Sequence, residues 1–321
     1  MMNSAPKIFV AIAAYEDPLL AWTINHAWEQ ASRPDCLTFG VVEQAVLTLP
    51  ECKGGDYLRQ VPWRESMRYL GFHPRFARGP CWARNIGFSL YGGEDFVLQI
   101  DSHMYFEKGW DDTLIEQAWA WQRATRNPRV MLSTYPNGFT LDHGIPTLSP
   151  TVEGVIVLQP KPQEHLQNEH PVMMFHGVPV PSTQPIAGCH IGAGCLFASG
   201  SLVQEVPYDP WLYFHGEEQN MAVRAWTHGY DIVHPLRMPI YHYYKQPDHQ
   251  AAVHWRESDD AQRTERWWEL ERKAQNRLAD LLYHQNIQGA YGLGERRTLA
   301  EFAQFSGIDY TQRHLRRPPA V

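Results

Sequence analysis

Residues 96–112 read FVLQIDSHMYFEKGWDD, and an uncharged run there ends in a carboxylate. The run 96–100 has the length and composition of a buried strand. Asp101 follows it directly, and His103 comes two positions later. Side chains two positions apart on an extended chain point to the same side. We therefore expect Asp101 and His103 to face one site, with Ser102 turned away.

The position and chemistry of this pair predict a cation site. In open α/β sheets, ligands bind beyond the carboxyl ends of the strands. Carboxylate oxygens suit a hard divalent cation, and imidazole suits Mn²⁺ or a similar metal. A cation held by these two residues would keep open coordination positions, and these would bind the oxygens of a diphosphate. Spacing alone leaves a plainer alternative open, in which Asp101 caps the next turn and His103 is an ordinary surface histidine.

The rest of the chain alternates between strand and helix patterns. This alternation predicts an α/β fold with a largely parallel sheet and helices on its faces. The first strand ends in AAYED, without a glycine-rich dinucleotide motif or a P-loop lysine. Strands are expected at 7–14, 36–42, 96–100, 129–133, 154–158, 194–198, 230–234 and 240–244, and helices at 18–28, 81–91, 109–123, 217–227 and 258–285.

Domain organisation is predicted from composition. Residues 159–187 carry six prolines and are expected to form an irregular surface insertion. We expect residues 1–250 to be a catalytic domain and residues 251–321 a helical extension.

Charge and cysteine content exclude several classes of protein. The net charge is −7 and 20% of residues are charged, which argues against nucleic-acid binding. Five cysteines without a C-x-x-C argue against a disulfide framework or a zinc ribbon, and favour a reducing, cytoplasmic location. The first apolar stretch is too short to span a membrane and lacks a signal-peptide pattern. The 12 tryptophans and 15 tyrosines fit core packing or sugar stacking.

Further polar residues lie beside expected elements. Arg84 lies in the helix expected just before the 96–100 strand. Glu217 and Glu218 begin the helix expected at 217–227, where carboxylates suit the positive end of the helix dipole. Cys189 and Cys195 flank a histidine and small residues, GCHIGAGC. A thiol nucleophile is conceivable there, but the small residues favour backbone passing close to a sugar, with the thiols as packing.

Several segments together resemble the family 60 glycosyltransferases, the GlcNAc-transferase family related to the enzyme that modifies hydroxyproline in Skp1. The order of DSH, GEE and WTHGYD carries the resemblance, which spans most of the chain outside the proline-rich insertion. The matching segments are 8–15, 79–84 (GPCWAR), 99–110 (QIDSHMYFEKGW), 192–199 (GAGCLFAS), 216–235 (GEEQNMAVRAWTHGYDIVHP) and 291–299 (YGLGERRTL).

The resemblance implies a GT-A fold, a Rossmann-like mixed sheet flanked by helices, that binds Mn²⁺ or Mg²⁺ and a nucleotide-sugar donor. Asp101 and His103 would bind the metal, although the family motif usually ends in a second aspartate. His242 is the favoured third ligand, with His249 and His254 as alternatives. The donor would be UDP-GlcNAc, with UDP-galactose and UDP-GalNAc left open, and the acceptor a hydroxyl of a protein or glycan.

The resemblance also assigns roles around the donor. Arg84 would assist the diphosphate or the sugar hydroxyls. Glu217 and Glu218 would lie beneath the sugar and, because the family is expected to retain configuration, would orient substrate rather than act as a base. The donor-binding residues implied are Ala13, Tyr15, Glu43, Arg84, Asp101, Ser102 and Gly194.

The sequence leaves two other functions open. A non-haem Fe(II) oxygenase would use Asp101, His103 and His242 as a facial triad, but such enzymes usually have a double-stranded β-helix and the reverse motif order. A non-catalytic carbohydrate-binding module would use the aromatic residues as platforms and would bind ligand in the presence of EDTA.

Overall fold

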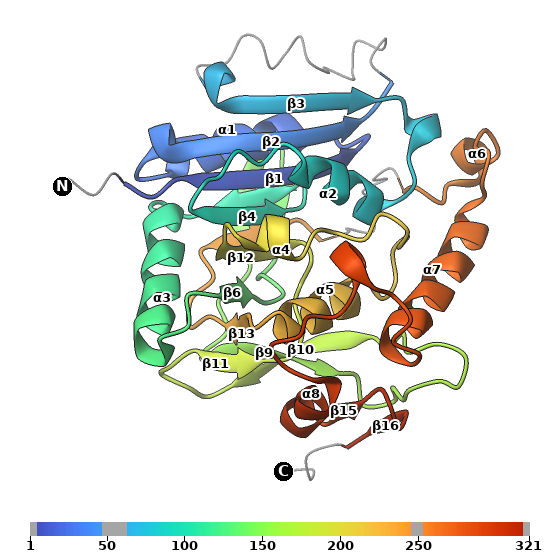
Figure 1. The fold of residues 1–321 in the computed structure, drawn as a ribbon. Coiled ribbons are helices and arrows are strands. Elements are labelled where there is room, and N and C mark those ends of the chain that lie inside the picture. The colour runs from blue at the N-terminus through green and yellow to red at the C-terminus, as the bar shows by residue number, and fades with distance from the viewer. Residues whose placement is uncertain (1–4, 47–62, 245–252, 317–321) are drawn as a thin grey trace.

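The centre of the molecule is an eight-stranded mixed sheet with the order β11-β13-β6-β12-β4-β1-β2-β3 (Figure 1). The structure is a computed structural model that describes residues 5–46, 63–244 and 253–316. The strands of this sheet are β1 (Ile8–Tyr15), β2 (Leu37–Gln44), β3 (Met67–Phe72), β4 (Phe96–Ile100), β6 (Val130–Ser133), β11 (Ile186–Gly188), β12 (Cys195–Ser199) and β13 (Asp231–His234).

The pairing confirms the predicted mixed sheet. β1 lies between β2 and β4 and is parallel to both. β12 is antiparallel to its neighbours β4 and β6. Because β1, β2 and β4 all point the same way, their carboxyl ends share one edge of the sheet, where Asp101 lies. The strand β3 had no counterpart in the sequence prediction.

Alternating side chains place helices on both faces of the sheet. On β1, Ile8 and Val10 pack in one apolar cluster with α1 and α3, whereas Phe9 and Ala11 pack in a second with α2, α5 and α7. This period of two is expected of a strand buried on both faces. The helices are α1 (Leu20–Gln30), α2 (Pro80–Phe88), α3 (Trp110–Thr125), α4 (Leu202–Glu205), α5 (Glu217–Thr227), α6 (Glu257–Asp260), α7 (Trp267–Leu282) and α8 (Leu299–Ser306).

The proline-rich segment is more regular than predicted. β10 (Phe175–Val180) forms an antiparallel ribbon with β9 (Val155–Pro160), and β11 joins the edge of the main sheet. The expectation of a wholly irregular insertion at 159–187 is therefore wrong. Proline lacks a backbone N–H donor. Pro160 and Pro179 are nevertheless tolerated, because each strand of a two-stranded ribbon has one free edge at which no donor is needed.

The single long helix expected at 258–285 is also wrong, because it is divided into α6 and α7. The Asp260 carboxylate accepts a hydrogen bond of 2.8 Å from the Trp267 amide and so caps α7. Leu278 on α7 packs in the same cluster as Met221 on α5. On α8, Phe302 contacts Trp226 with 5.3 Å between ring centroids. The C-terminal segment therefore shares a core with the sheet.

Short ribbons lie beside the main sheet. β5 (Met104–Phe106) pairs with β14 (Ile240–His242), β7 (Phe139–Asp142) with β8 (Ile145–Leu148), and β15 (Ile308–Asp309) with β16 (His314–Leu315). Within the described residues, 3₁₀ turns connect elements at Pro34–Cys36, Arg64–Ser66, Pro74–Phe76 and Gly289–Tyr291.

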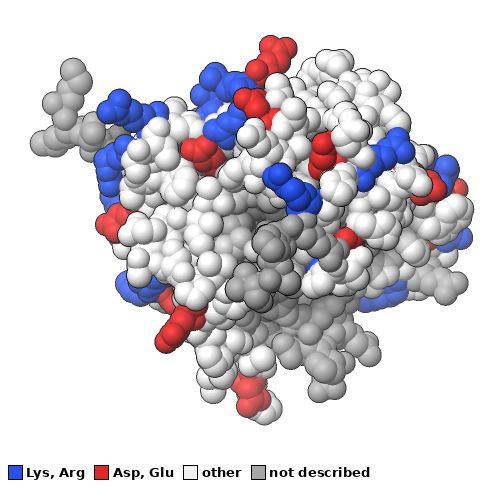
Figure 2. Space-filling view, turned by 90° about the horizontal axis from the view of Figure 1, so that it is seen from below, with Lys and Arg blue, Asp and Glu red and all other residues white. Residues whose placement is uncertain are grey.

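No helix in the described residues combines the length and apolar character needed to cross a bilayer. Figure 2 shows acidic and basic side chains interspersed over one face of the molecule, and the described part of that face carries no continuous basic stripe.

Candidate functional site

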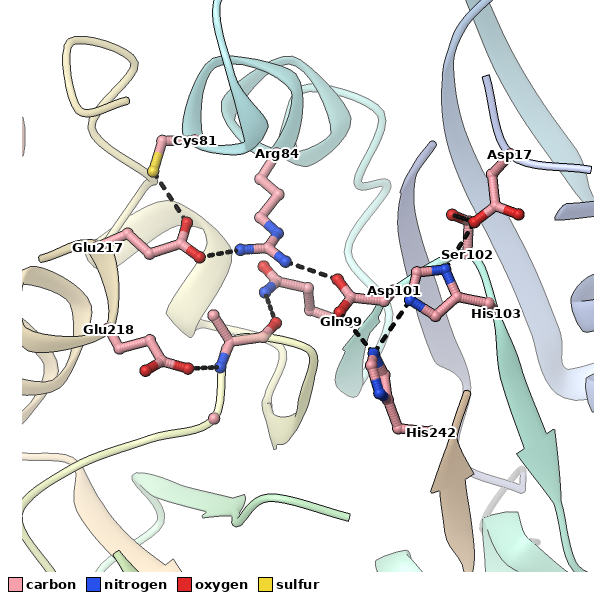
Figure 3. Close-up of polar contacts among 12 residues, drawn as sticks. Asp17, Cys81, Arg84, Gln99, Asp101, Ser102, His103, Glu217, Glu218 and His242 are labelled. Carbon is pink, nitrogen blue, oxygen red and sulfur yellow. Dashed lines mark hydrogen bonds and ion pairs between the residues drawn. The ribbon is translucent and has the colours of Figure 1, made fainter. Parts of the chain in front are cut away.

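Three side chains converge at the edge of the sheet where β1 and β4 end (Figure 3). The ligand atoms of Asp101, His103 and His242 all lie within 4.8 Å of one another. Asp101 follows β4, His103 precedes β5 and His242 ends β14. β14 pairs antiparallel with β5, with His242 opposite Met104. This pairing brings His242 to a histidine 139 positions earlier in the chain.

Asp101, His103 and His242 form a cluster that we name the metal group, and its donor atoms fit a divalent cation. His103 Nε2 lies 3.0 Å from His242 Nε2, which lies 3.2 Å from Asp101 Oδ2. One carboxylate oxygen and two imidazole nitrogens suit Mn²⁺ or a similar borderline metal. The three residues expected from the sequence to bind metal are thus together in space.

Arg84 links the metal group to the acidic helix α5 (Figure 3). Its Nη2 donates to Asp101 Oδ1 at 2.8 Å, and its Nη1 donates to Glu217 Oε1 at 2.6 Å. The Cys81 thiol donates to the other oxygen of Glu217 at 2.9 Å. The Arg84 side chain is only 7% exposed. Its guanidinium is therefore held between two carboxylates instead of being presented to solvent.

These contacts set the charge states of the two carboxylates. Burial raises the pKa of Asp101, but the hydrogen bond from His242 and the positive charge of Arg84 outweigh it and hold this pKa well below its usual range. Burial also raises the pKa of Glu217, and there the opposing charge of Arg84 does not cancel the effect. Asp101 is consequently ionised at neutral pH.

Glu218 is the more accessible member of the acidic pair. Its Oε2 accepts a hydrogen bond from the Tyr135 hydroxyl at 2.8 Å, and its Oε1 accepts one from the Ala193 amide at 2.9 Å. Burial raises the pKa of Glu218, but the neighbouring His190 outweighs this and lowers it. The side chain of Glu218 is 28% exposed, against 9% for Glu217. Glu218 is therefore the carboxylate of the pair that a ligand can reach.

The small residues before β12 make room for the metal group. A Cβ atom on Gly194 would lie 2.5 Å from Asp101 Oδ2, so a larger residue would displace that carboxylate. The nearby thiols are unsuited to nucleophilic catalysis, because burial raises the pKa of Cys189 to about 12 and Cys195 is fully buried. The interpretation of these thiols as packing residues agrees with the full burial of Cys195 and with the packing of half-buried Cys189 against the apolar core.

A pocket opens beside Asp101 at the end of β1. The Tyr15 hydroxyl accepts a hydrogen bond of 2.5 Å from Arg263, and His254 packs against the Tyr15 ring at 5.4 Å between centroids. His254, an alternative metal ligand in the sequence, bonds instead to the Tyr213 hydroxyl, and His249 lies outside the described residues. The pocket is lined by Ala13, Tyr15, Gln44, Gly79, Pro80, Arg84, Asp101 and His254.

The family of the chain follows from a comparison of its sequence. The family described as Glycosyltransferase (GlcNAc) matches residues 58–312, which is well over half of the chain. The chain belongs to this GlcNAc glycosyltransferase family. The narrower resemblance to family 60 stays a prediction. A comparison with curated proteins gives no match.

The fold of this GlcNAc glycosyltransferase is GT-A, as the sequence predicts. A crystal structure of GalNAc-T7 with UDP, GalNAc and Mn²⁺ is similar, with a TM-score of 0.57 and 13% identity over 77% of this chain and 45% of that chain. The chain therefore spans less than half the length of GalNAc-T7. Two structures with lower scores are S. aureus TarS 1-349 with UDP-GlcNAc (TM-score 0.44, 16% identity, 77% and 62% coverage) and the mannosyltransferase PcManGT from Pyrobaculum calidifontis with GDP-Man and Mn²⁺ (0.47, 14%, 77% and 59%).

Two of the predicted donor-binding residues of this glycosyltransferase have other partners. Glu43 accepts a 2.6 Å hydrogen bond from the Tyr69 hydroxyl, and its neighbour Gln44 lines the pocket instead. The hydroxyl of Ser102 donates to Asp17 at 2.6 Å. The fold also disagrees with the oxygenase alternative, because a mixed sheet covered by helices is not a double-stranded β-helix.

Three residues that contact the candidate site had not been predicted from the sequence. Asp17 contacts His103 and Ser102, whereas Tyr135 and His190 contact Glu218. Asp17 and Tyr135 each lie two residues beyond the end of a strand of the main sheet, β1 and β6. A search for polar residues after every predicted parallel strand would have found both of them.

Proposed function

We propose that this chain is a metal-dependent glycosyltransferase that moves GlcNAc from UDP-GlcNAc to a hydroxyl of a protein or glycan, with retention. The observation that carries the proposal is the convergence of Asp101, His103 and His242 beside the pocket at the end of β1. Family membership and the GT-A fold support the reaction class. The GalNAc-T7 structure, which contains UDP, GalNAc and Mn²⁺, supports a UDP-sugar and a divalent metal.

The metal site would be held by one carboxylate and two imidazoles. Asp101, His103 and His242 would bind Mn²⁺ or Mg²⁺ and leave its other positions open. When bound, the cation supplies positive charge that neutralises the leaving diphosphate. Gly194 leaves space for the Asp101 carboxylate at this point.

Arg84 and Glu217 would position the metal group, and Arg84 would do so from the wall of the pocket at the end of β1. Both ends of the Arg84 guanidinium are occupied by Asp101 and Glu217. Buried, paired groups of this kind fix the orientation of the side chains they contact. We therefore assign Arg84 the role of holding Asp101, and Glu217 the role of holding Arg84 in place of the direct role expected for Glu217.

Glu218 would orient the donor sugar or the acceptor. Three groups hold its carboxylate, yet the side chain remains partly accessible. An ionised carboxylate accepts hydrogen bonds from sugar hydroxyls. Tyr135 and the Ala193 amide would keep it aimed at the substrate.

The test is release of UDP from UDP-GlcNAc by the purified protein, with Mn²⁺ and with EDTA. We expect EDTA to abolish release, and Asp101→Ala to lower it by about 10²- to 10³-fold. Asp95→Ala is a matched control, because Asp95 lies exposed before the opposite end of β4. Proton NMR at early times, before the released sugar mutarotates, gives its anomeric configuration and so tests retention. Undiminished turnover by Asp101→Ala would contradict the metal site, and succinate formation from 2-oxoglutarate would support the oxygenase alternative.

A further inference from the structure

The carboxylate of Asp17 lies directly behind the metal group (Figure 3). Its Oδ2 accepts hydrogen bonds from His103 Nδ1 and from the Ser102 hydroxyl, both at 2.6 Å. Its Oδ1 accepts a 2.8 Å bond from the Leu19 amide. The Asp17 side chain is 13% exposed. Its two oxygens therefore have three partners within the protein, and one of them is an imidazole of the metal group.

This contact determines which nitrogen of His103 is available to a metal. A carboxylate only accepts hydrogen bonds, so Nδ1 of His103 carries the hydrogen. In the neutral ring the lone pair is then on Nε2, the atom that lies 3.0 Å from His242 Nε2 in the metal group. Histidines that bind metals commonly donate their other N–H to a carboxylate, which fixes the ring and strengthens it as a ligand.

The second imidazole lacks such a partner. Among the described residues, nothing accepts a hydrogen bond from His242 Nδ1, although this atom is buried. The His242 ring is instead held by contact with Tyr244, at 4.3 Å between centroids, and with His103, at 4.7 Å. The two imidazoles therefore differ in how they are oriented, and only His103 is backed by a carboxylate.

Asp17 also connects the metal group to the donor pocket. It lies two residues after Tyr15, which lines that pocket. The loop that carries His103 has an independent anchor on α1, because the Thr23 hydroxyl donates to the Ser102 carbonyl at 2.8 Å and accepts from the Met104 amide at 3.0 Å. This anchor would keep the loop in place when Asp17 is changed.

We propose that Asp17 is a positioning residue for the metal site: it fixes His103 as the Nδ1–H tautomer, makes it the stronger of the two imidazole ligands, and joins the first strand's end to the cation. The inference rests on the proposed function, because it requires a metal at Asp101, His103 and His242. Asp17 acts through His103 and contacts neither the cation nor the substrate.

The test is Mn²⁺ affinity of the whole protein, measured without nucleotide from the EPR signal of free Mn²⁺. We expect Asp17→Asn, which keeps the size of the side chain, to raise the Mn²⁺ dissociation constant about 10- to 100-fold. UDP affinity without metal should change less than about twofold. Ser102→Ala removes the other bond to the same Asp17 oxygen and should leave Mn²⁺ affinity within about threefold. Circular dichroism and melting temperature check that each variant is folded.

A double-mutant cycle separates positioning from a general effect on the fold. If Asp17 acts through His103, the variant with Asp17→Asn and His103→Ala should bind Mn²⁺ no more weakly than His103→Ala alone. Additive losses, wild-type affinity in Asp17→Asn, or an equal loss in Ser102→Ala would each overturn the inference. If His103→Ala and Asp101→Ala both bind Mn²⁺ like wild type, the proposed metal site itself fails and this inference fails with it.

Discussion

Replacing Arg84 with methionine should destabilise the protein strongly, and more so at higher pH. The substitution keeps an unbranched side chain but removes the charge that lies between Asp101 and Glu217. Glu217 is then left as a buried carboxylate whose remaining side-chain donor is the Cys81 thiol. Loss of one partner from a buried ion pair typically costs about 3–5 kcal/mol.

This free energy converts into a measurable change in melting temperature. Unfolding entropy of about 2.1 cal/mol/K per residue, taken over 321 residues, means that 1 kcal/mol lowers the melting temperature by about 1.5 °C. Arg84→Met should therefore melt about 4 to 7 °C below wild type. Differential scanning calorimetry at pH 8 in EDTA, which keeps metal away from Asp101, measures the difference.

The pH dependence gives the direction of the effect. Burial already raises the pKa of Glu217 while Arg84 is present, and removal of Arg84 raises it further. The folded variant then binds a proton that the unfolded chain releases, so its free energy of unfolding falls as pH rises. The melting-temperature deficit should thus shrink from pH 8 to pH 5.5. Adding Glu217→Gln to the variant should recover part of the loss. A deficit under 2 °C at pH 8, or one that grows on acidification, would refute the reasoning.

Four further outcomes are expected. His242→Ala should raise the Mn²⁺ concentration for half-maximal UDP release at least about tenfold, because one of three ligands is lost; an unchanged titration would indicate another ligand. Glu218→Gln should lower the rate of sugar transfer about 10²-fold, while its UDP affinity measured by calorimetry stays within about threefold of wild type. Equal losses in transfer rate and UDP affinity would make Glu218 a nucleotide-binding residue. Burial lowers the pKa of His234 to about 4. The stability that neutral His234 contributes to the folded protein above pH 6.5 should therefore be lost as pH falls toward 4, by up to about 3 kcal/mol. In His234→Gln, the melting temperature should fall less steeply over this pH range. Phe302→Ala, which removes the contact with Trp226, should cost about 3–5 kcal/mol in one cooperative calorimetric transition, whereas two transitions would favour an independent C-terminal domain.

The sheet was predictable because its strands carry strong local signals. Uncharged, largely apolar runs such as β1 and β4 are typical of strands covered on both faces. Asp101 was recognisable because it interrupts such a run. β5 and β14 are three residues each, too short for periodicity to predict their pairing. The break between α6 and α7 depends on one side chain, Asp260, which a helical pattern does not distinguish from surface charge.

The candidate site was predictable in its residue types but not in its connections. The sequence indicated Arg84, Glu217 and Asp101 separately, and each has an ordinary explanation alone. Their chain of hydrogen bonds exists only because α2, α5 and β4 meet at one edge of the sheet. Asp17 was missed because an acid before a proline resembles a helix start, and its contact with His103 spans 86 positions.

The pairing of β14 with β5 has a consequence for when the protein can acquire its proposed cation. Asp101 and His242 are separated by 141 positions, so a chain emerging from the ribosome exposes the Asp-x-His pair long before the last ligand is synthesised. Contacts between such distant residues form late in folding, after the cost of closing the intervening loop has been met. Cation uptake would then mark a finished and folded chain, and truncated or stalled products would be left without the ion.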